Sequence, residues 1–284
     1  MPAGAPFDTV AAFLLDKTHG AAEVERRLDA GEVVLTDGTV VTRQTPYAAG
    51  GWAFLYRDVL PEATVPGELT VLYRDENIVV VDKPHFLATM PRGSHVAQTV
   101  VVRLRRELGL PELTAAHRLD RLTAGVLLAT VRRDVRAAYQ EMFARREARK
   151  TYYALAPLGG LPLPTEVHSR IVKERGTLQV REVPGEINAI TRVELDATLG
   201  ANLGRYRLTP LTGRTHQLRV HMAGLGIPIL GDPLYPTIRE ARPDDFDDPL
   251  QLLAHTLAFT DPLTGEDRCF TSRRTLSGPV GGPH

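Results

Sequence analysis

The sequence predicts an α+β protein with a mixed, largely antiparallel central sheet, flanking helices and a small α/β appendage at the amino terminus. Short apolar runs bounded by turn residues alternate with only a few segments of helical period. The chain of 284 residues also exceeds the usual length of one domain, which favours a main domain plus a small unit. This mixture of strands and occasional helices is typical of an α+β fold.

The first 60 residues are predicted to form the appendage. Apolar residues of helical period span Val10–Leu15 and Val24–Leu28. Two short strands follow, Val33–Leu35 and Thr39–Thr42, and Asp37-Gly38 between them predicts a hairpin, because this pair tolerates positive φ. Residues 61–68 contain prolines and a glycine and are predicted to be a linker.

The main domain is predicted over residues 69–275, followed by a flexible Pro- and Gly-rich tail, 276–284. It opens with two strands that turn at Asp75-Glu76-Asn77. Asp134 is expected to cap a helix that continues to Ala148. The other predicted elements are a helix at Gln98–Leu108, a buried strand at Gly125–Thr130, a strand at Lys150–Pro157 and a helix at His216–Leu225.

Composition points to a soluble cytoplasmic protein. The sequence is 43% apolar and 24% charged, and it lacks an apolar run long enough for a membrane span. No positive charge precedes the first apolar run, which argues against a secretory signal. The single cysteine, Cys269, cannot form an internal disulfide, and this fits a reducing compartment.

Positive charge is segregated along the chain although the formal net charge is zero. Between Pro91 and Lys150 there are thirteen Arg or Lys against six Asp or Glu, an excess of 13 − 6 = 7. Such a stretch suits a polyanionic partner, and it equally suits a set of solvated helix faces. Charge alone leaves both interpretations open.

The segment HRLDRLTAGVLLAT, His117 to Thr130, places an acid in a tight polar loop just before a buried strand. Such a loop holds a carboxylate rigidly at a sheet edge. A nucleophilic carboxylate needs this rigidity, and a nearby arginine keeps it ionised. Asp120 is therefore a candidate nucleophile. The alternative is a structural aspartate that accepts backbone hydrogen bonds and pairs with Arg121.

A second polar cluster lies in GRTHQLRVHMAGLGIPILGDPLYP, which contains Arg214, His216, Arg219 and His221 within eight residues. The histidines are five apart, so they face opposite sides of a strand or lie about 140° apart on a helix. This spacing differs from the i and i+4 pair of a helical metal site, and no metal is predicted. The arginines have the same offset, so both are not expected to serve one small site.

These two stretches resemble the HRLDxxTSG and GRTHQIRVHxxxxGxPIxGDxxY signatures of RluA-type pseudouridine synthases. NIVVVDKP, KTYYA and LLAHTLAFTDPLTGE follow the order of further motifs of that family, so the resemblance covers Leu69 to Thr271. Ala124 stands where the family usually has Ser. The amino-terminal unit resembles, in degenerate form, the small RNA-binding domain of ribosomal protein S-four type.

The resemblance implies the pseudouridine synthase fold and the isomerisation of uridine to pseudouridine in structured RNA, without a cofactor. It implies that Asp120 is the nucleophile and that Arg219 pairs with it. It also implies that Tyr152 stacks on the base and assists removal of the carbon 5 proton. Tyr153 should face the opposite way if this segment is a strand.

A uridine within a stem must be flipped out to reach a buried carboxylate, and Arg118 matches the family's flipping arginine. Its alternative role is a surface ion pair with Glu112. Expected RNA and base-flipping residues are Arg118, His117 and Arg121. The expected substrate pocket contains Thr123, Gly125, Arg214, His216 and Gln217. Expected phosphate contacts are Lys83, Arg103, Arg105 and Arg106.

The expected partner is RNA, with large-subunit ribosomal RNA favoured, transfer RNA as the second candidate, and a monomeric enzyme. A different class of protein would be a non-catalytic RNA clamp, which needs none of Asp120, Tyr152 and Arg219. Another is a metal-dependent phosphoesterase built on His117, Asp120, His216 and His221, whose activity a chelator would abolish.

Overall fold

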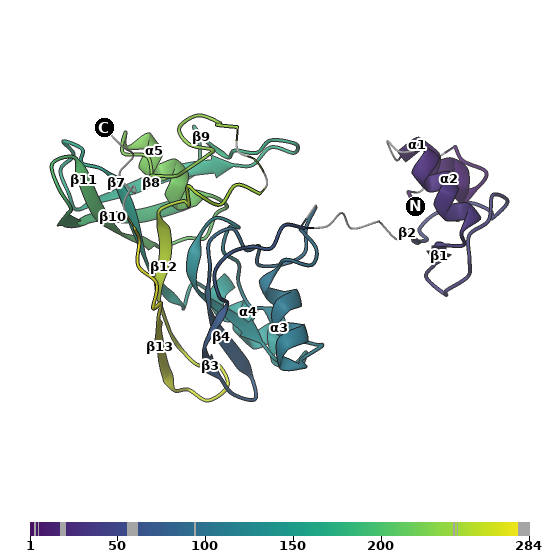
Figure 1. The fold of residues 1–284 in the computed structure, drawn as a ribbon, viewed down its shortest axis with the longest axis horizontal. Coiled ribbons are helices and arrows are strands. Elements are labelled where there is room, and N and C mark those ends of the chain that lie inside the picture. Colours follow the sequence, from purple (N-terminus) through teal and green to yellow (C-terminus); the bar gives the residue numbers. More distant parts are fainter. Residues whose placement is uncertain are drawn as a thin grey trace. The chain divides into compact units, whose positions relative to one another are not determined.

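Separate hydrophobic cores divide the chain, in the computed structural model, into an amino-terminal unit, Met1–Leu60, and a larger unit, Pro61–His284 (Figure 1). The structure describes residues 1–2, 4, 6–17, 21–55, 62–93, 95–240, 242 and 244–277. Among the helices it describes, none has the length and apolar character needed to cross a membrane.

The amino-terminal unit contains two helices, α1 (Val10–Lys17) and α2 (Ala21–Asp29), and a two-stranded sheet of β1 (Val33–Leu35) and β2 (Ala53–Leu55). The predicted hairpin turn forms, with a bridge between Val34 and Val40 and backbone bonds from Leu35 to Thr39 and from Val41 to Val33, but residues 39–42 are not a named strand. β1 also pairs with β2, a more distant segment whose apolar residues join the same core. Local turn chemistry could not reveal that partner.

The larger unit is built on one 11-stranded sheet in the order β3-β4-β6-β12-β7-β11-β10-β8-β9, with β13 beside β12 and β5 beside β6. Among the strands that the structure describes, only β6 and β12 pair in parallel, which confirms the predicted mixed, largely antiparallel α+β fold. The strands are β3 (Thr70–Arg74), β4 (Ile78–Lys83), β5 (Thr114–Ala115), β6 (Ala124–Thr130), β7 (Arg149–Pro157), β8 (Thr165–Val172), β9 (Arg181–Val183), β10 (Ala189–Thr198), β11 (Leu203–Pro210), β12 (Leu252–Thr260) and β13 (Asp267–Thr271).

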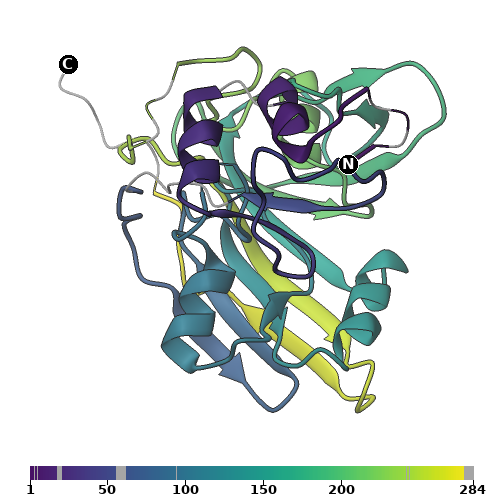
Figure 2. The ribbon, with the colours of Figure 1, turned by 90° about the vertical axis from the view of Figure 1, so that its right-hand side faces the viewer.

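Helices cover both faces of the central strands, so β4 and β6 are apolar at successive positions and fully buried. α3 (Val100–Leu108) and α5 (Gln217–Gly224) pack on the core that contains Val79 and Val81. α4 (Arg136–Ala144) packs on the core that contains Ile78 and Val80. Figure 2 shows α3 and α4 on opposite sides of the strands, with the yellow β12 and β13 between them.

The predicted cap of α4 is wrong. Val135 occupies the N-cap position with helical φ and ψ, and the side chain of Asp134 pairs instead with Arg132. The helix also ends at Ala144, before the predicted Ala148. In the part of the predicted linker that is described, the Glu62 carboxylate accepts hydrogen bonds from residues 96–98 of the larger unit. Of the predicted tail, only residues 276 and 277 are described.

The parallel contact between β6 and β12 requires a glycine. Gly125 has φ +114°, and a Cβ at this position would lie 2.1 Å from the carbonyl oxygen of Ala254. Ala254 also pairs with Tyr152 of β7, so Gly125, Ala254 and Tyr152 form one row across three adjacent strands. This row places Tyr152 beside the start of β6, where the loop containing Asp120 ends.

Candidate active site

The loop that contains Asp120 connects β5 to β6 and is fixed on both sides of the aspartate. The hydroxyl of Thr89 donates to the Leu119 carbonyl at 2.8 Å and accepts from the Leu119 amide at 3.2 Å. The buried ammonium of Lys83 donates to the Arg121 carbonyl at 3.1 Å. The Thr123 amide donates to the carbonyl of Asp120 itself at 3.1 Å. These four hydrogen bonds restrain the loop, in agreement with its predicted rigidity.

Arg219 of α5 lies near Asp120 but binds another acid more tightly. Its Nη1 is 3.7 Å from Asp120 Oδ2, whereas its Nε and Nη2 donate to Asp232 at 2.7 and 2.6 Å. Both members of the Arg219–Asp232 pair are almost completely buried. Burial opposes the charge of Arg219, but hydrogen bonds and the charge of Asp232 raise its pKa. Asp232 was not identified from the sequence.

Asp232 reaches Arg219 because Gly231 allows a close backbone approach. Gly231 has φ +70°, and a Cβ there would lie 2.3 Å from the carbonyl oxygen of Pro249. The amides of Leu234 and Tyr235 then donate to Asp232 Oδ1 at 2.8 and 3.2 Å. The carboxylate is thus held by its own turn as well as by the arginine.

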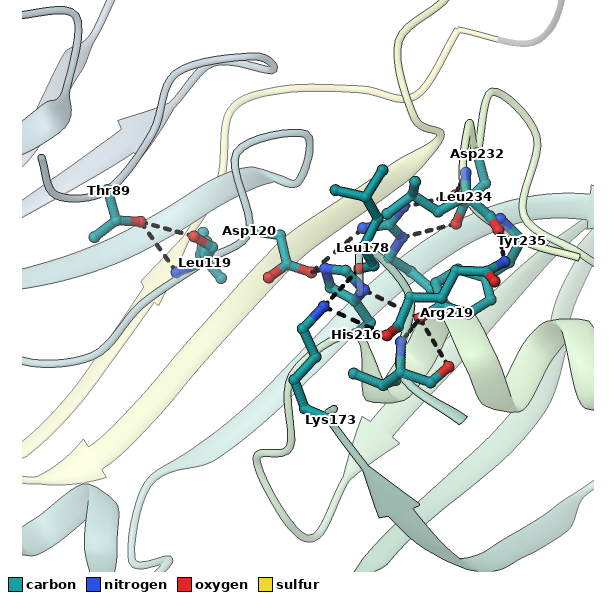
Figure 3. A network of polar contacts seen from close by, with 12 residues as sticks. Thr89, Leu119, Asp120, Lys173, Leu178, His216, Arg219, Asp232, Leu234 and Tyr235 are labelled. Atoms are coloured by element: carbon teal, nitrogen blue, oxygen red, sulfur yellow. Dashed lines mark hydrogen bonds and ion pairs between the residues drawn. The ribbon is translucent and has the colours of Figure 1, made fainter. Parts of the chain in front are cut away.

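His216 contacts both Asp120 and Tyr235. Its Nε2 is 3.9 Å from Asp120 Oδ2, and its Nδ1 is 3.1 Å from the hydroxyl of Tyr235. The residue has φ +53°, an uncommon conformation for a side chain other than glycine, at the N-cap of α5. Burial lowers its pKa although Asp120 acts in the opposite direction, so the ring is neutral at neutral pH. Figure 3 shows Asp120, His216, Arg219 and Asp232 as one cluster.

The side-chain oxygens of Asp120 lie near Arg219 and His216 without being hydrogen-bonded by them. The contacts to Arg219 and His216 are 3.7 and 3.9 Å, beyond normal hydrogen-bond length. Within the described ranges, no other donor bonds to the carboxylate, whose side chain is 26% exposed. Its lone pairs are therefore free to react, as a nucleophile requires.

A cavity of about 340 Å³ opens in front of Asp120, and its volume is typical of small-molecule sites. Tyr152 lines it, and burial followed by the charge of Asp120 raises the pKa of the phenol, which stays protonated at neutral pH. Tyr153 faces the other side of β7 and packs against His255 and Arg205. The predicted opposite orientation of the two tyrosines is confirmed.

The two arginines expected to serve different sites both line this cavity. That expectation treated Arg214 and Arg219 as parts of one periodic element. α5 begins only at Gln217, so Arg214 belongs to the preceding loop, and its side chain lines the same cavity as that of Arg219. Its Nε donates to the Asn188 carbonyl at 3.2 Å, and its contacts therefore differ from those of Arg219.

Among the other expected pocket residues, Thr123, His216 and Gln217 line the cavity, whereas Gly125 does not. Gly125 instead permits the contact with β12 described above. All four hydrogen-bonding positions of the Gln217 amide are occupied by protein, so its contacts are structural. The amide bonds to Thr212 Oγ1, the Arg214 amide, the Ile190 carbonyl and Thr191 Oγ1.

The three residues expected to contact RNA and flip the base have different surroundings in the structure. Arg118 lines the cavity, is exposed, and forms no ion pair with Glu112 or with another described acid. His117 accepts a hydrogen bond from the Leu128 amide and packs on Phe143, and burial lowers its pKa to about 3. It is a neutral support of the loop. Arg121 lies over the Phe86 ring, outside the cavity lining.

Lys83 is wrongly predicted as a phosphate contact. The side chain is fully buried, and its three donors are bound to the carbonyls of Pro84, Leu87 and Arg121. Burial lowers its pKa, and the charge of Asp120 opposes this shift. A sequence pattern could not show that the lysine points inward.

The predicted phosphate-binding arginines of α3 also differ from one another. Arg103 donates to the side chain of Gln98, and Arg105 Nε donates to the Leu113 carbonyl at 2.8 Å. Arg106 is exposed and has no hydrogen-bond or acid partner among the described residues. Two cations that were not predicted as site residues, Arg146 and Lys150, line the cavity instead. Neither forms an ion pair with an acid among the described residues.

The side chains required by a metal-dependent phosphoesterase do not form a metal site, although His117, Asp120 and His216 line one cavity. His221 is buried on the far side of α5, where its nitrogens contact Ser169 and Thr191, both at 2.9 Å. His117 is occupied by the Leu128 amide. In the described ranges, no cluster of three His, Cys, Asp or Glu side chains is arranged to hold a metal ion.

Comparison with known proteins identifies the class. Residues 77–224 match the RNA pseudouridylate synthase family. The chain is 35% identical over 209 residues to the dual-specificity RNA pseudouridine synthase RluA of Escherichia coli O6:H1, strain CFT073, covering 71% of this chain and 91% of that protein. The corresponding enzyme of Haemophilus influenzae is 33% identical over 214 residues, covering 72% and 93%.

A solved structure agrees. The human RNA Pseudouridylate Synthase Domain Containing 4 is 26% identical, with a TM-score of 0.57 over 72% of this chain and 88% of that chain. The fold, the cavity and these likenesses define an RNA pseudouridine synthase, and the chain belongs to that family. Within it, the chain is of the RluA type, which confirms the resemblance found in the sequence.

Proposed function

We propose that this enzyme isomerises a uridine that is flipped out of folded RNA, and that Asp120 starts cleavage of the bond between uracil and ribose. One observation carries the proposal. Asp120 is an acid on a rigid loop, close to two potential donors yet hydrogen-bonded by neither, and it faces a cavity of about 340 Å³. A structural aspartate would be expected to use its oxygens as hydrogen-bond acceptors.

The reaction breaks the bond from uracil N1 to ribose and forms one from C5. The C5 proton leaves and N1 gains a proton, so the sum is an isomerisation that needs no redox partner. We assign to Arg219 the electrostatic support of the Asp120 carboxylate. Tyr152 is assigned to stacking on the base, because its raised pKa leaves little phenolate to act as a base at neutral pH.

Cations on the cavity rim are suited to the phosphates that flank the flipped uridine. Arg118, Arg146 and Lys150 all line the cavity, and the described acids pair with none of them. The described cations of the amino-terminal unit, in contrast, all pair with acids: Lys17, Arg26, Arg27 and Arg43. The larger unit is therefore assigned the phosphate contacts, and the S-four-like unit a secondary role in binding RNA.

Large-subunit ribosomal RNA is the substrate class we propose, with transfer RNA as the second candidate. Relatives of 33 to 35% identity are named as dual-specificity enzymes, which supports activity on uridines in more than one RNA. We further propose a cytoplasmic monomer. Mapping pseudouridines across total RNA from cells with and without the gene tests the substrate, since the target uridine disappears from the map only in the correct RNA.

The decisive variant is Asp120→Asn. The amide keeps the shape of the side chain but loses its negative charge and nucleophilicity, so we expect no turnover with nearly unchanged folding and RNA affinity. Single-turnover conversion and a binding titration are measured on the RNA identified by mapping. Conversion by the Asn variant above the enzyme-free background would exclude Asp120 from the chemistry.

A further inference from the structure

The loop between β8 and β9 presents an apolar side chain to solvent at its end. Leu178 is 63% exposed, more than any other leucine in the described ranges. Single exposed leucines are common on protein surfaces and by themselves indicate nothing. Leu178 differs from other exposed leucines in two respects: hydrogen bonds hold its loop in one shape, and the same loop is bonded to the active-site cluster.

The loop is held in one shape by its own side chains. The ammonium of Lys173 donates to the carbonyls of Thr177 and Leu178, the latter at 2.7 Å. The hydroxyl of Thr177 lies 2.9 and 3.0 Å from the carbonyls of Glu174 and Gln179. Glu174 forms an ion pair with Arg181 across the base of the loop. A surface loop with these restraints presents Leu178 in a preorganised position.

The same loop is bonded to the active-site cluster. The Val180 amide donates to the hydroxyl of Tyr235 at 2.7 Å, and that hydroxyl is 3.1 Å from Nδ1 of His216. Lys173 is close enough to His216 to contribute to the lowering of its pKa, after burial and Arg219. Figure 3 shows Lys173 bonded to the Leu178 carbonyl within the same network of polar contacts as His216. The loop is therefore linked to the active-site cluster through Tyr235 and His216.

The charges around Leu178 suit RNA. Lys173 and Arg175 are exposed and form no ion pair with the acids that the structure describes, while Glu174 is neutralised by Arg181. An apolar side chain on a loop that also carries an exposed, unpaired arginine, Arg175, matches a base step with its flanking phosphate. It does not match a purely apolar protein groove. Apolar residues, including leucine, are inserted between base steps by proteins that distort nucleic acids.

We propose that Leu178 is an apolar wedge, which inserts into paired RNA beside the target uridine and occupies the space that the flipped base leaves. This inference rests on the proposed flipping of a uridine towards Asp120. Arg118 is then free to bind the displaced phosphate, for which a guanidinium is better suited than for filling a stack. A side chain held in place before binding fills the gap without a further loss of loop entropy.

The test compares one uridine in two settings. A hairpin RNA carries the mapped uridine in its stem, and a second RNA has the opposing strand altered so that the uridine is unpaired. We expect Leu178→Ala to slow single-turnover conversion of the paired RNA about tenfold, since flipping itself costs a few kcal/mol, and to leave the unpaired RNA unchanged. Leu178→Met, which keeps an apolar side chain of similar length, should restore the rate on the paired RNA.

Leu263→Ala is the matched control, because Leu263 is an exposed leucine, 46% accessible, in the turn between β12 and β13. It should not change either rate. A 2-aminopurine placed beside the target uridine should brighten on binding of the wild type and less so on binding of Leu178→Ala. Equal losses on both RNAs, or no loss on either, would overturn the wedge. Failure of the underlying function gives a different result, namely conversion of neither RNA by the wild type.

Discussion

The buried Arg219–Asp232 pair predicts a large cost for a single change of charge. In Asp232→Asn, the side chain keeps its shape but loses the charge that neutralises Arg219, and one of its two acceptors becomes a donor facing another donor. Arg219 is 2% and Asp232 1% exposed, with bonds of 2.7 and 2.6 Å. Breaking a buried pair on one side costs about 3–5 kcal/mol in the free energy of unfolding.

The chain contains a matched control for this change. Arg205 binds Asp196 with contacts of 2.7 and 2.6 Å, but these side chains are 44% and 18% exposed. Asp196→Asn should therefore cost only about 0–1 kcal/mol. Urea unfolding of the wild type and both variants measures the difference. Similar midpoints for Asp232→Asn and Asp196→Asn would refute the argument from burial.

The same variant should also affect catalysis at temperatures where it is folded. Arg219 is already 3.7 Å from Asp120, and two unit charges at such a distance attract by roughly 4 kcal/mol at an effective dielectric constant of 20. Without Asp232, we expect the guanidinium to bond directly to Asp120 and block it. The expected loss in kcat/KM is about tenfold or more. Unchanged kcat/KM in a folded Asp232→Asn enzyme would show that the second acid does not position Arg219.

Two further predictions concern Lys83 and His117, whose polar atoms are bound by other parts of the protein. Lys83→Met leaves three carbonyls without a donor and should destabilise the fold by about 3 kcal/mol, while the salt dependence of RNA binding stays unchanged; a shallower salt dependence would mean that Lys83 does contact phosphate. For His117, the pKa of about 3 in the folded protein lies below the ordinary 6.5, so the unfolded chain binds more protons between these values and stability falls as the pH drops through that window. His117→Gln should reduce this slope by about 1.4 kcal/mol per pH unit in urea titrations; equal slopes in the wild type and His117→Gln would contradict a neutral His117.

The sequence allowed prediction of those features that depend on local pattern. The run Gly125–Thr130 became a buried strand because both of its faces are covered by helices. The opposite orientations of Tyr152 and Tyr153 followed from strand geometry alone. The position of Asp120 in a restrained loop before that strand was also predicted. In each case the deciding interaction lies within the segment or on its immediate neighbours.

Several predictions failed because they depended on distant partners. Lys83 was predicted to contact phosphate at the surface, where lysine usually lies. Its ammonium is instead buried, because it donates to three loop carbonyls. Arg214 and Arg219 were predicted to serve different sites because both were placed in one periodic element. α5 begins only at Gln217, so Arg214 lies outside it. Asp232 went unnoticed because no spacing rule links a loop carboxylate to an arginine thirteen residues earlier on a helix.

The arrangement around Asp120 answers a conflict between placing cations near a carboxylate and leaving its oxygens open. A cation that hydrogen-bonds to a carboxylate stabilises its charge but also occupies its lone pairs. Here most donors of the two buried cations near Asp120 are committed elsewhere: those of Lys83 to three carbonyls, and Nε and Nη2 of Arg219 to Asp232. Their charges still act on Asp120 through space, while its oxygens stay open to the cavity. A second buried acid, Asp232, is therefore required for the first to remain unbound, and this is why a change at Asp232 should affect turnover as well as stability.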